Sequence, residues 1–134
     1  MKEFRDIKVA DVMTTNLVIV DGLTTIAEAI KLMAEKETNT LIIDKRHEED
    51  EYGIIIAADI ATQVVGQNRP PERISVYEIM SKPILFVRPG MDIRYCARFF
   101  SRFKISRAPV IDHGSIIGIV SYDSMILKSV SVGS

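Results

Sequence analysis

Internal repetition is the feature of this sequence that most constrains its fold, because a duplicated pattern predicts two similar structural units. Residues 9–14 (VADVMT) recur as residues 76–81 (VYEIMS), so that Met13 and Met80 hold equivalent positions. Each segment predicts one turn of amphipathic helix that ends in a methionine followed by a hydroxyl residue. We call residues 9–14 and 76–81 the two opening segments.

Both opening segments are followed by the same series of strands and helices. Three apolar runs in each copy are typical of buried strands. They occupy residues 17–20, 41–44 and 53–56 in the first copy and residues 84–87, 109–112 and 118–121 in the second. A final helix is expected at about residues 59–65 and 123–130. The order strand, helix, strand, strand, helix therefore occurs twice, which predicts a mixed α/β fold of the α+β kind.

The helix between the first two strands has its own start signal in each copy. Thr24 or Thr25 is expected as the N-cap in the first copy, and Asp92 in the second. Apolar residues then recur at helical spacing and are expected to face the core. These are Ile26, Ala29, Ile30 and Met33 in the first copy and Ile93, Ala97 and Phe100 in the second.

Two segments differ between the copies. Residues 67–74 are polar and contain two prolines, which predicts a linker between a first repeat at 1–66 and a second at 75–134, together one compact module. Residues 45–51 (KRHEEDE) lengthen the connection between the second and third strands of the first copy. We expect a solvated loop there rather than a metal site, because adjacent side chains on a hairpin diverge.

Charge and cysteine content narrow the class of protein. The formal net charge is −1, from 17 basic and 18 acidic residues, which argues against nucleic-acid or membrane binding by bulk electrostatics. The N-terminal residues are charged, and no run approaches the roughly 18 apolar residues of a membrane span. The single cysteine, Cys96, fits a reducing compartment and is expected to be a buried small apolar residue. We therefore expect a cytoplasmic protein.

Several segments in both copies resemble the tandem form of the cystathionine β-synthase (CBS) domain family over about residues 8–130. They are residues 11–14, 53–59, 78–81, 105–112 and 118–123. The resemblance implies two β-α-β-β-α repeats packed about a pseudo-twofold axis with two ligand clefts. It also implies a disc-like homodimer that binds AMP, ADP, ATP or S-adenosylmethionine and relays occupancy to an effector protein, here in trans.

The family's ribose-binding pattern is glycine, two apolar residues, a hydroxyl residue, any residue, a hydroxyl residue and aspartate. In the first copy Asp59 keeps the carboxylate, although it could instead be the N-cap of the following helix. In the second copy Ser121 supplies a hydroxyl, and by strict count Ser124 stands at the aspartate position. Either the last two residues of the pattern are exchanged, or one position has been deleted and Asp123 is the equivalent residue.

The resemblance also implies that a basic residue before the second strand meets the ligand's phosphate. Arg107 holds this position, and the alternative is an ordinary surface arginine. The first implied cleft is lined by Met13, Thr14, Val18, Thr38, Thr40, Arg107, Ser121, Asp123 and Ser124. The second is lined by Met80, Leu85, Asn39, Ser106, Ala108 and Asp59. We favour the first cleft, because it has both the cation and the hydroxyl.

The sequence contains no motif of a known catalytic centre. A glycine-rich phosphate loop, a paired metal-ligand motif and a nucleophile elbow are all missing. We expect no catalytic residues, no metal site and no obligatory cofactor. The sequence therefore predicts a regulatory module for an adenine nucleotide, with AMP first. The alternatives are a ligand-free dimerisation or protein-interaction module, and a sensor of S-adenosylmethionine or another adenosyl ligand.

Overall fold

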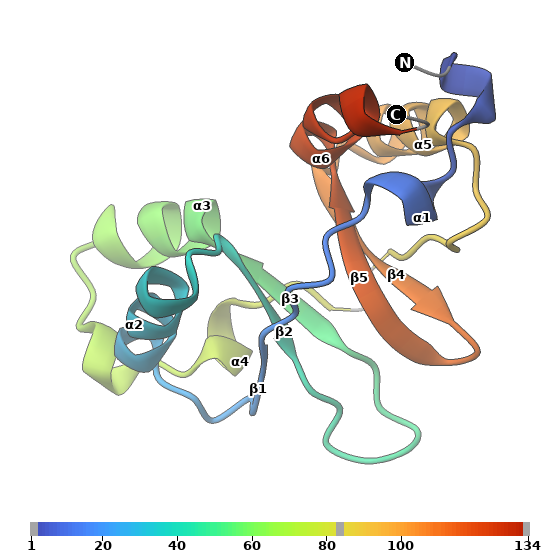
Figure 1. The fold of residues 1–134 in the computed structure, drawn as a ribbon. Coiled ribbons are helices and arrows are strands. Elements are labelled where there is room, and N and C mark those ends of the chain that lie inside the picture. The colour runs from blue at the N-terminus through green and yellow to red at the C-terminus, as the bar shows by residue number, and fades with distance from the viewer. Residues whose placement is uncertain (1–2, 83–84, 133–134) are drawn as a thin grey trace. The chain divides into compact units, whose positions relative to one another are not determined.

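The structure is a computed structural model that describes residues 3–82 and 85–132, and it divides into two compact units (Figure 1). Residues 18–84 form one unit, which we call the central unit. Residues 1–17 and 85–134 form the other, which we call the terminal unit. Both units combine helices with strands, as the α+β prediction requires.

The central unit contains a three-stranded sheet in the order β1-β2-β3. The strands are β1 (Ile19–Val20), β2 (Thr40–Ile43) and β3 (Gly53–Ile56). β1 is parallel to β2, whereas β2 and β3 are antiparallel. The helices are α2 (Ile26–Lys36), α3 (Ala57–Ile60), a π-helical turn (Ala61–Val65), a 3-10 turn (Pro71–Arg73) and α4 (Val76–Ile79).

The terminal unit is built on the antiparallel hairpin of β4 (Arg107–Asp112) and β5 (Ser115–Ser121). Its helices are α1 (Val9–Val12), α5 (Ile93–Phe103), α6 (Tyr122–Leu127) and 3-10 turns at Phe4–Asp6 and Ser129–Ser131. The strand predicted at residues 84–87 is reduced to a parallel bridge between Val87 and Val110, and Ile84 lies outside the described residues.

The predicted helix caps are present. The Thr25 hydroxyl accepts a hydrogen bond from the Glu28 N–H (3.1 Å), and the Asp92 carboxylate accepts one from the Arg94 N–H (2.8 Å). Each cap satisfies a backbone donor that has no partner inside its helix. Thr25, rather than Thr24, is therefore the N-cap of α2.

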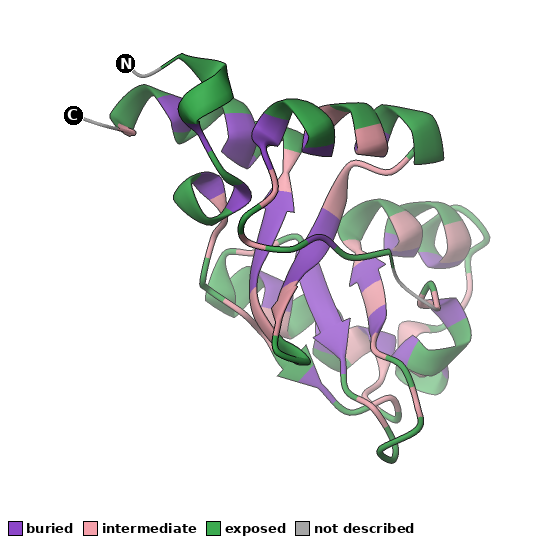
Figure 2. Ribbon diagram, turned by 90° about the vertical axis from the view of Figure 1, so that its right-hand side faces the viewer, coloured by how far each residue is buried: buried purple, intermediate pink, exposed green. Residues whose placement is uncertain are grey.

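Each unit has its own apolar core, and the strands are its most buried part (Figure 2). The predicted buried faces of α2 and α5 are largely confirmed: Ile26, Ala29, Met33, Ile93 and Phe100 are buried. Ala97 is only half-buried, and the prediction for Ile30 is wrong, because 42% of its surface is exposed. The apolar stripe of α2 is therefore narrower than the sequence indicated.

The two opening segments pack in exchanged positions. Thr14, from the first repeat, forms backbone hydrogen bonds in both directions with Ile119 of the second (2.8 and 2.9 Å). Ser81, from the second repeat, does the same with Ile54 of the first (2.9 and 3.1 Å). Each compact unit therefore combines the opening segment of one repeat with the strands of the other.

A methionine packed on a glycine fixes each exchanged segment. A Cβ atom added to Gly118 would lie 2.8 Å from both the Met13 sulfur and the Thr14 carbonyl oxygen. A Cβ atom added to Gly53 would collide only with the side chain of Met80. The glycine in the third strand of each repeat thus leaves room for the methionine of the other.

These two contacts predict unequal effects of the same substitution. Gly118→Ala requires the backbone at Thr14 to move and should lower the free energy of unfolding by about 1–3 kcal/mol, the usual cost of overpacking. Gly53→Ala needs only a shift of the flexible Met80 side chain and should cost less. Urea unfolding of both variants measures the difference, and an equal or larger loss in Gly53→Ala would contradict this account.

The buried position predicted for Cys96 is confirmed, since its side chain is fully covered. Burial raises the pKa of the Cys96 thiol to about 11. Because the thiolate is the reactive form, Cys96 should react with Ellman's reagent at pH 8 far more slowly in the native protein than in urea. Equal rates in the two conditions would show that the thiol is accessible.

Candidate functional site

Polar residues gather at one edge of the β4–β5 hairpin in the terminal unit. Arg107 begins β4 and is paired with Ser121, the last residue of β5. Arg107 is half-buried, and its Nε donates to the Ser106 hydroxyl (3.4 Å). The hairpin therefore places a guanidinium and two hydroxyl residues at the same edge.

Ser121 and Ser124 cap the start of α6 together. The Ser121 N–H donates to the Ser124 hydroxyl (2.9 Å), and the Ser124 N–H donates to the Ser121 hydroxyl (3.0 Å). Ser124 is buried, whereas the neighbouring Asp123 is exposed. Of the two residues considered for the ribose carboxylate position, Asp123 is the one that presents its side chain to solvent.

The opening segment of the first repeat lies beside this edge. Thr14 pairs with Ile119, two residues before Ser121, and the Met13 carbonyl accepts from the Lys128 ammonium (3.3 Å). Ala108 is fully buried, and Leu85 is 41% exposed. The terminal unit thus brings together Met13, Thr14, Ser106, Arg107, Ser121, Asp123 and Ser124.

The central unit has an equivalent polar edge where β2 begins. The Thr38 hydroxyl donates to the Thr40 carbonyl (3.2 Å), and the Thr40 hydroxyl donates to the Asn39 side-chain oxygen (2.9 Å). The Asn39 carbonyl accepts from the N–H of Ala57, the first residue of α3. The start of β2 and the start of α3 therefore lie together.

Asp59 belongs to the same edge, but it is not the N-cap of the helix. The N-cap position is Ile56, and the half-buried Asp59 carboxylate accepts from the Ile56 N–H (3.1 Å). Ile56 has no side-chain oxygen, so a carboxylate from the third helical residue satisfies the backbone instead. Met80 lies at the C-cap of α4, packed on Gly53.

The residues predicted for each cleft are divided between the two units. Of the first set, Val18, Thr38 and Thr40 belong to the central unit and the others to the terminal unit. Of the second set, Asn39, Asp59 and Met80 belong to the central unit, and Leu85, Ser106 and Ala108 to the terminal unit. Their combination into clefts stays a prediction.

The sequence predicted a solvated loop at residues 45–51, but the structure attaches this loop to a neighbouring element. The Asp50 carboxylate, with only 8% of its side chain exposed, forms ion pairs with Lys82 and with Arg46 (3.3 Å). Arg46 also lies over the Tyr77 ring, 4.5 Å from its centroid. The hydrogen bond from Lys82, above all, holds the pKa of Asp50 well below its usual range. These contacts anchor the loop to the end of α4.

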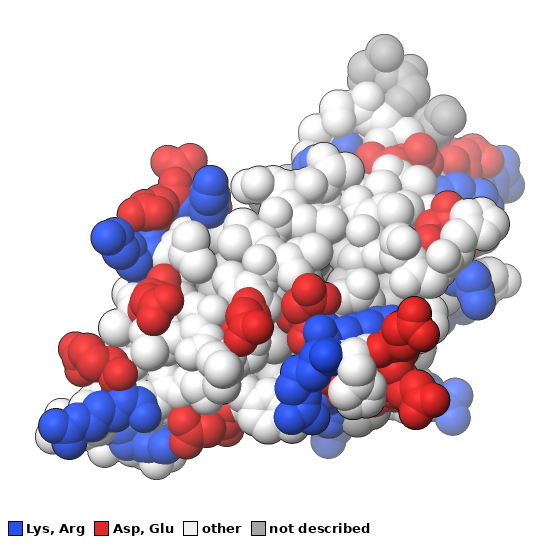
Figure 3. Space-filling model, turned by 90° about the horizontal axis from the view of Figure 1, so that it is seen from below, with Lys and Arg blue, Asp and Glu red and all other residues white. Residues whose placement is uncertain are grey.

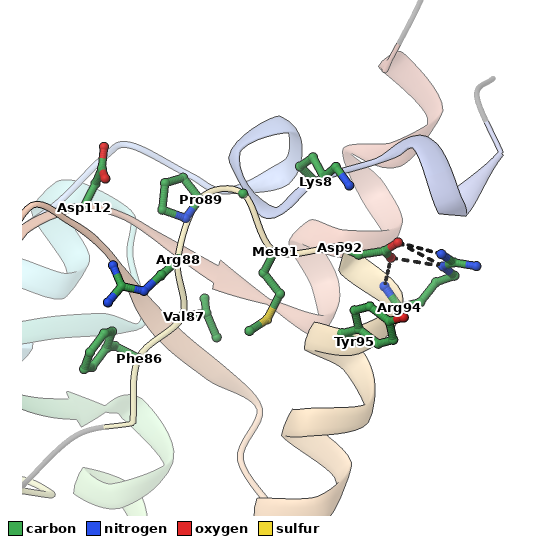
Figure 4. Close-up of a pocket in the computed structure, with 11 residues that line it drawn as sticks. Lys8, Phe86, Val87, Arg88, Pro89, Met91, Asp92, Arg94, Tyr95 and Asp112 are labelled. Atoms are coloured by element: carbon green, nitrogen blue, oxygen red, sulfur yellow. Dashed lines mark hydrogen bonds and ion pairs between the residues drawn. The ribbon is translucent and has the colours of Figure 1, made fainter.

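A pocket of about 800 Å³ lies at the other end of the terminal unit (Figure 4). It surrounds the turn at residues 89–91, which precedes α5, and it also includes Asp112 at the end of β4. The Asp92 carboxylate in its wall binds the Arg94 guanidinium (2.7 Å), which lowers the pKa of Asp92 to about 2. Arg107 and this pocket lie at opposite ends of β4.

A broader binding role would need clustered charge, grouped metal ligands or a long apolar helix. Acidic and basic side chains are intermixed on the face shown in Figure 3. Among residues 3–82 and 85–132, no group of three His, Cys, Asp or Glu side chains could hold a metal ion. In the same part of the chain, every helix is too short or too polar to cross a membrane.

The repeated edges, built from equivalent segments of the two repeats, agree with the comparison to known families. The CBS domain model matches residues 9–66 and 76–130. The chain belongs to the CBS domain family. A pair of CBS domains is a regulatory, ligand-binding module.

Curated relatives share the tandem pattern at modest identity. An uncharacterized protein of Methanopyrus kandleri is 26% identical over 123 residues, which are 91% of this chain and 62% of that protein. The CBS domain-containing protein YhcV of Bacillus subtilis is 28% identical over 92% of this chain and 86% of its own length. The chain thus spans about three fifths of the first relative.

Solved structures extend the comparison. A hexameric CBS-CP12 protein from bloom-forming cyanobacteria is 41% identical, with a TM-score of 0.88, over 92% of this chain and 71% of that one. The CBS domain pair of protein MJ0100 was solved with 5-methylthioadenosine and S-adenosyl-L-methionine. It is 26% identical, with a TM-score of 0.75, over 89% of this chain and 92% of that one.

Because Asp50 anchors the loop through two ion pairs, thermal stability should depend on Asp50 and on pH. Asp50→Asn should lower the melting temperature at pH 7, because it removes a carboxylate held by two cations. Since folding lowers the pKa of Asp50, its contribution is present above about pH 4 and is lost as the pH falls below that value. The difference between the wild type and Asp50→Asn should therefore narrow in acid.

Glu48→Gln is the matched control, because Glu48 is an exposed acid in the same loop. Thermal unfolding followed by circular dichroism between pH 7 and pH 2 measures all three proteins. A melting temperature for Asp50→Asn equal to that of Glu48→Gln at pH 7 would show that the loop is not anchored through Asp50.

Proposed function

We propose that this CBS-domain pair is a regulatory module that binds an adenine nucleotide, with AMP as the favoured ligand. It would signal to a separate effector protein whether the ligand is bound. The observation that carries the proposal is the polar edge of the terminal unit. There the half-buried Arg107 is paired with Ser121, and the exposed Asp123 follows two residues later. This edge supplies a cation and a carboxylate at the positions where the family resemblance expects phosphate and ribose.

The chemistry of these groups suits a nucleoside phosphate. A guanidinium donates two parallel hydrogen bonds to phosphate oxygens, and a carboxylate accepts from the two ribose hydroxyls. Met13 and Thr14 would border the adenine, with Val18, Thr38 and Thr40 contributed by the central unit. The second proposed site, with Asn39 and Asp59, lacks a cation and already uses the Asp59 carboxylate for α3.

A second candidate ligand is S-adenosylmethionine or another adenosyl compound. The related domain pair of protein MJ0100 was solved with 5-methylthioadenosine and S-adenosyl-L-methionine. Neither ligand carries a phosphate, and 5-methylthioadenosine has no anionic group, so Arg107 would contribute little to its affinity, whereas the carboxylate of S-adenosylmethionine could still pair with Arg107. The response of binding to Arg107→Ala therefore discriminates AMP from an adenosyl ligand without an anionic group.

A ligand-free interaction module is the alternative from another class. It is favoured by the hydroxyls of Ser121 and Ser124, which already cap α6. In either case we propose a regulatory rather than catalytic role, self-association at least to a homodimer, and a cytoplasmic location. The hexameric CBS-CP12 protein, 41% identical, supports self-association.

Regulation requires that the ligand bind two arrangements of the protein with different affinity. The effector would then respond to the arrangement that the ligand favours. The ligand itself need not touch the effector, because a shift in the population of the two arrangements is sufficient.

Thermal shift and calorimetry with AMP, ADP, ATP and S-adenosylmethionine test the ligand directly. A ligand at 100 times its Kd should stabilise the protein by about 2.7 kcal/mol. Arg107→Ala should weaken AMP binding roughly 10- to 100-fold and adenosine binding much less, because a hydrogen bond to a charged group contributes about 1.5–3 kcal/mol.

The control is Arg102→Ala, because Arg102 is an exposed arginine on α5. This variant should bind AMP as tightly as the wild type. Equal weakening of AMP and adenosine by Arg107→Ala would remove the phosphate role. If none of the four compounds stabilises the protein at millimolar concentration, the adenine-sensor proposal is wrong and the interaction module takes its place.

A further inference from the structure

The pocket around residues 89–91 is separate from the proposed nucleotide edge. Both lie in the terminal unit, but Arg107 begins β4 and Asp112 ends it. At about 3.3 Å per residue, the two ends of the strand are roughly 17 Å apart. A ligand at the edge of Arg107 and Ser121 would therefore not fill this pocket, which we call the turn groove.

Cations border the turn groove, and its most buried acid is already neutralised. Asp92 binds Arg94 through both carboxylate oxygens, so its charge is balanced within the wall. Lys8 and Arg88 form no ion pair with any residue in the described ranges, although Lys8 is close enough to help lower the pKa of Asp92. Asp112 is the remaining acid, 43% exposed and 3.5 Å from His113.

Apolar side chains lie between these cations. Phe86 is 45% exposed and Tyr95 is 59% exposed, so both aromatic side chains that line the groove have surface left to contact a ligand. In Figure 4 Phe86 lies near Arg88 on one arm of the turn, Tyr95 lies near Arg94 on the other, and Met91 lies between them. A Cβ atom added to Gly90 would meet nothing within 4 Å, so the groove is open above the turn.

The placement of the cations indicates the shape of a ligand. In Figure 4 the Arg88 side chain points to one side of the turn, whereas Lys8 and Arg94 lie on the other. A compact anion would contact only one of these groups. An extended chain could place one acidic residue near Arg88, a second near Lys8, and an apolar side chain on the aromatic residues between them.

We propose that the turn groove docks an extended acidic segment of a partner protein, with an apolar residue between two acidic ones. The proposal rests on the proposed function only in taking this partner to be the effector. Binding of the segment itself requires no nucleotide. Contacts of this kind, an apolar centre between charged ends, give specificity and salt-dependent association.

A titration of the ¹⁵N-labelled full chain with the peptide acetyl-DELED-amide tests the proposal. The amide signals of Lys8, Gly90 and Tyr95 should shift on addition of the peptide, whereas those of Arg107 and Ser121 should not. Raising the salt from 50 to 500 mM should weaken binding at least threefold, because exposed charges are screened.

Three variants locate the contact. Arg88→Glu should weaken peptide binding at least threefold. Gly90→Leu should do the same, because it adds a side chain to the turn that the groove surrounds, at a position where an added Cβ atom meets nothing within 4 Å. Lys31→Glu makes the same charge change at an exposed position on α2 and should leave binding unchanged. The dispersion of each variant's ¹⁵N spectrum confirms that it is folded.

Four outcomes would overturn the proposal. The first is the absence of shifts up to millimolar peptide, and the second is binding that Arg88→Glu and Gly90→Leu leave intact. The third is tighter binding of tripolyphosphate with the same shifts, which would assign the groove to small anions. The fourth is a dependence of the Gly90 signal on protein concentration that Glu48→Lys abolishes, which would assign it to the acidic loop of a second copy.

The two proposals fail independently. Arg107→Ala should leave peptide binding unchanged, because Arg107 lies at the far end of β4. If the protein binds the peptide but no adenine ligand, the proposal for the turn groove stands and the proposed nucleotide site is rejected. If the protein binds an adenine ligand but not the peptide, the nucleotide site stands and the proposal for the turn groove is rejected.

Discussion

The contact of each opening methionine with a glycine in the other repeat is the constraint on which both units depend. Met13 on Gly118 and Met80 on Gly53 seat the two opening segments, and paired backbone hydrogen bonds one residue further along hold them there. Neither repeat can complete its core from its own residues, because Val9 and Val12 are fully buried in the core of the terminal unit. The two repeats therefore have to fold as a pair.

The exchange explains which parts of the fold could be predicted from the sequence. Strands, helices and caps follow from local spacing, so the order of elements and the roles of Thr25 and Asp92 were predictable. The exchange joins Met13 to Gly118, about a hundred positions away, and Met80 to Gly53, about thirty positions away. Nothing in local spacing indicates which glycine receives which methionine. The same limit applies to Asp50, whose partner Lys82 lies 32 residues away on another element.

The candidate site shows a competition that the motif alone does not reveal. The start of a helix leaves backbone N–H groups without partners, and the polar residues best placed to satisfy them are those of the ribose pattern. Asp59 satisfies the Ile56 N–H, and Ser121 and Ser124 satisfy each other. Asp123 keeps its side chain exposed because it lies one position away from this pair. In the second repeat, capping and carboxylate exposure therefore fall on different residues.

α1 is the element that connects the two ends of the terminal unit. At one end the N–H groups of Val9 and Ala10 donate to the carbonyls of Met91 and Pro89, in the turn that forms the groove (2.8 and 2.9 Å). At the other end Thr14 is paired with Ile119, near Ser121. Coupling between distant sites needs an element with two arrangements that both sites can bias. The β4–β5 hairpin is paired along its length, and α1 is a single turn held by hydrogen bonds at both ends and by the buried side chains of Val9 and Val12. A displacement of Met13 and Thr14 that moved α1 would therefore have to break its hydrogen bonds to Pro89 and Met91 or withdraw Val9 and Val12 from the core.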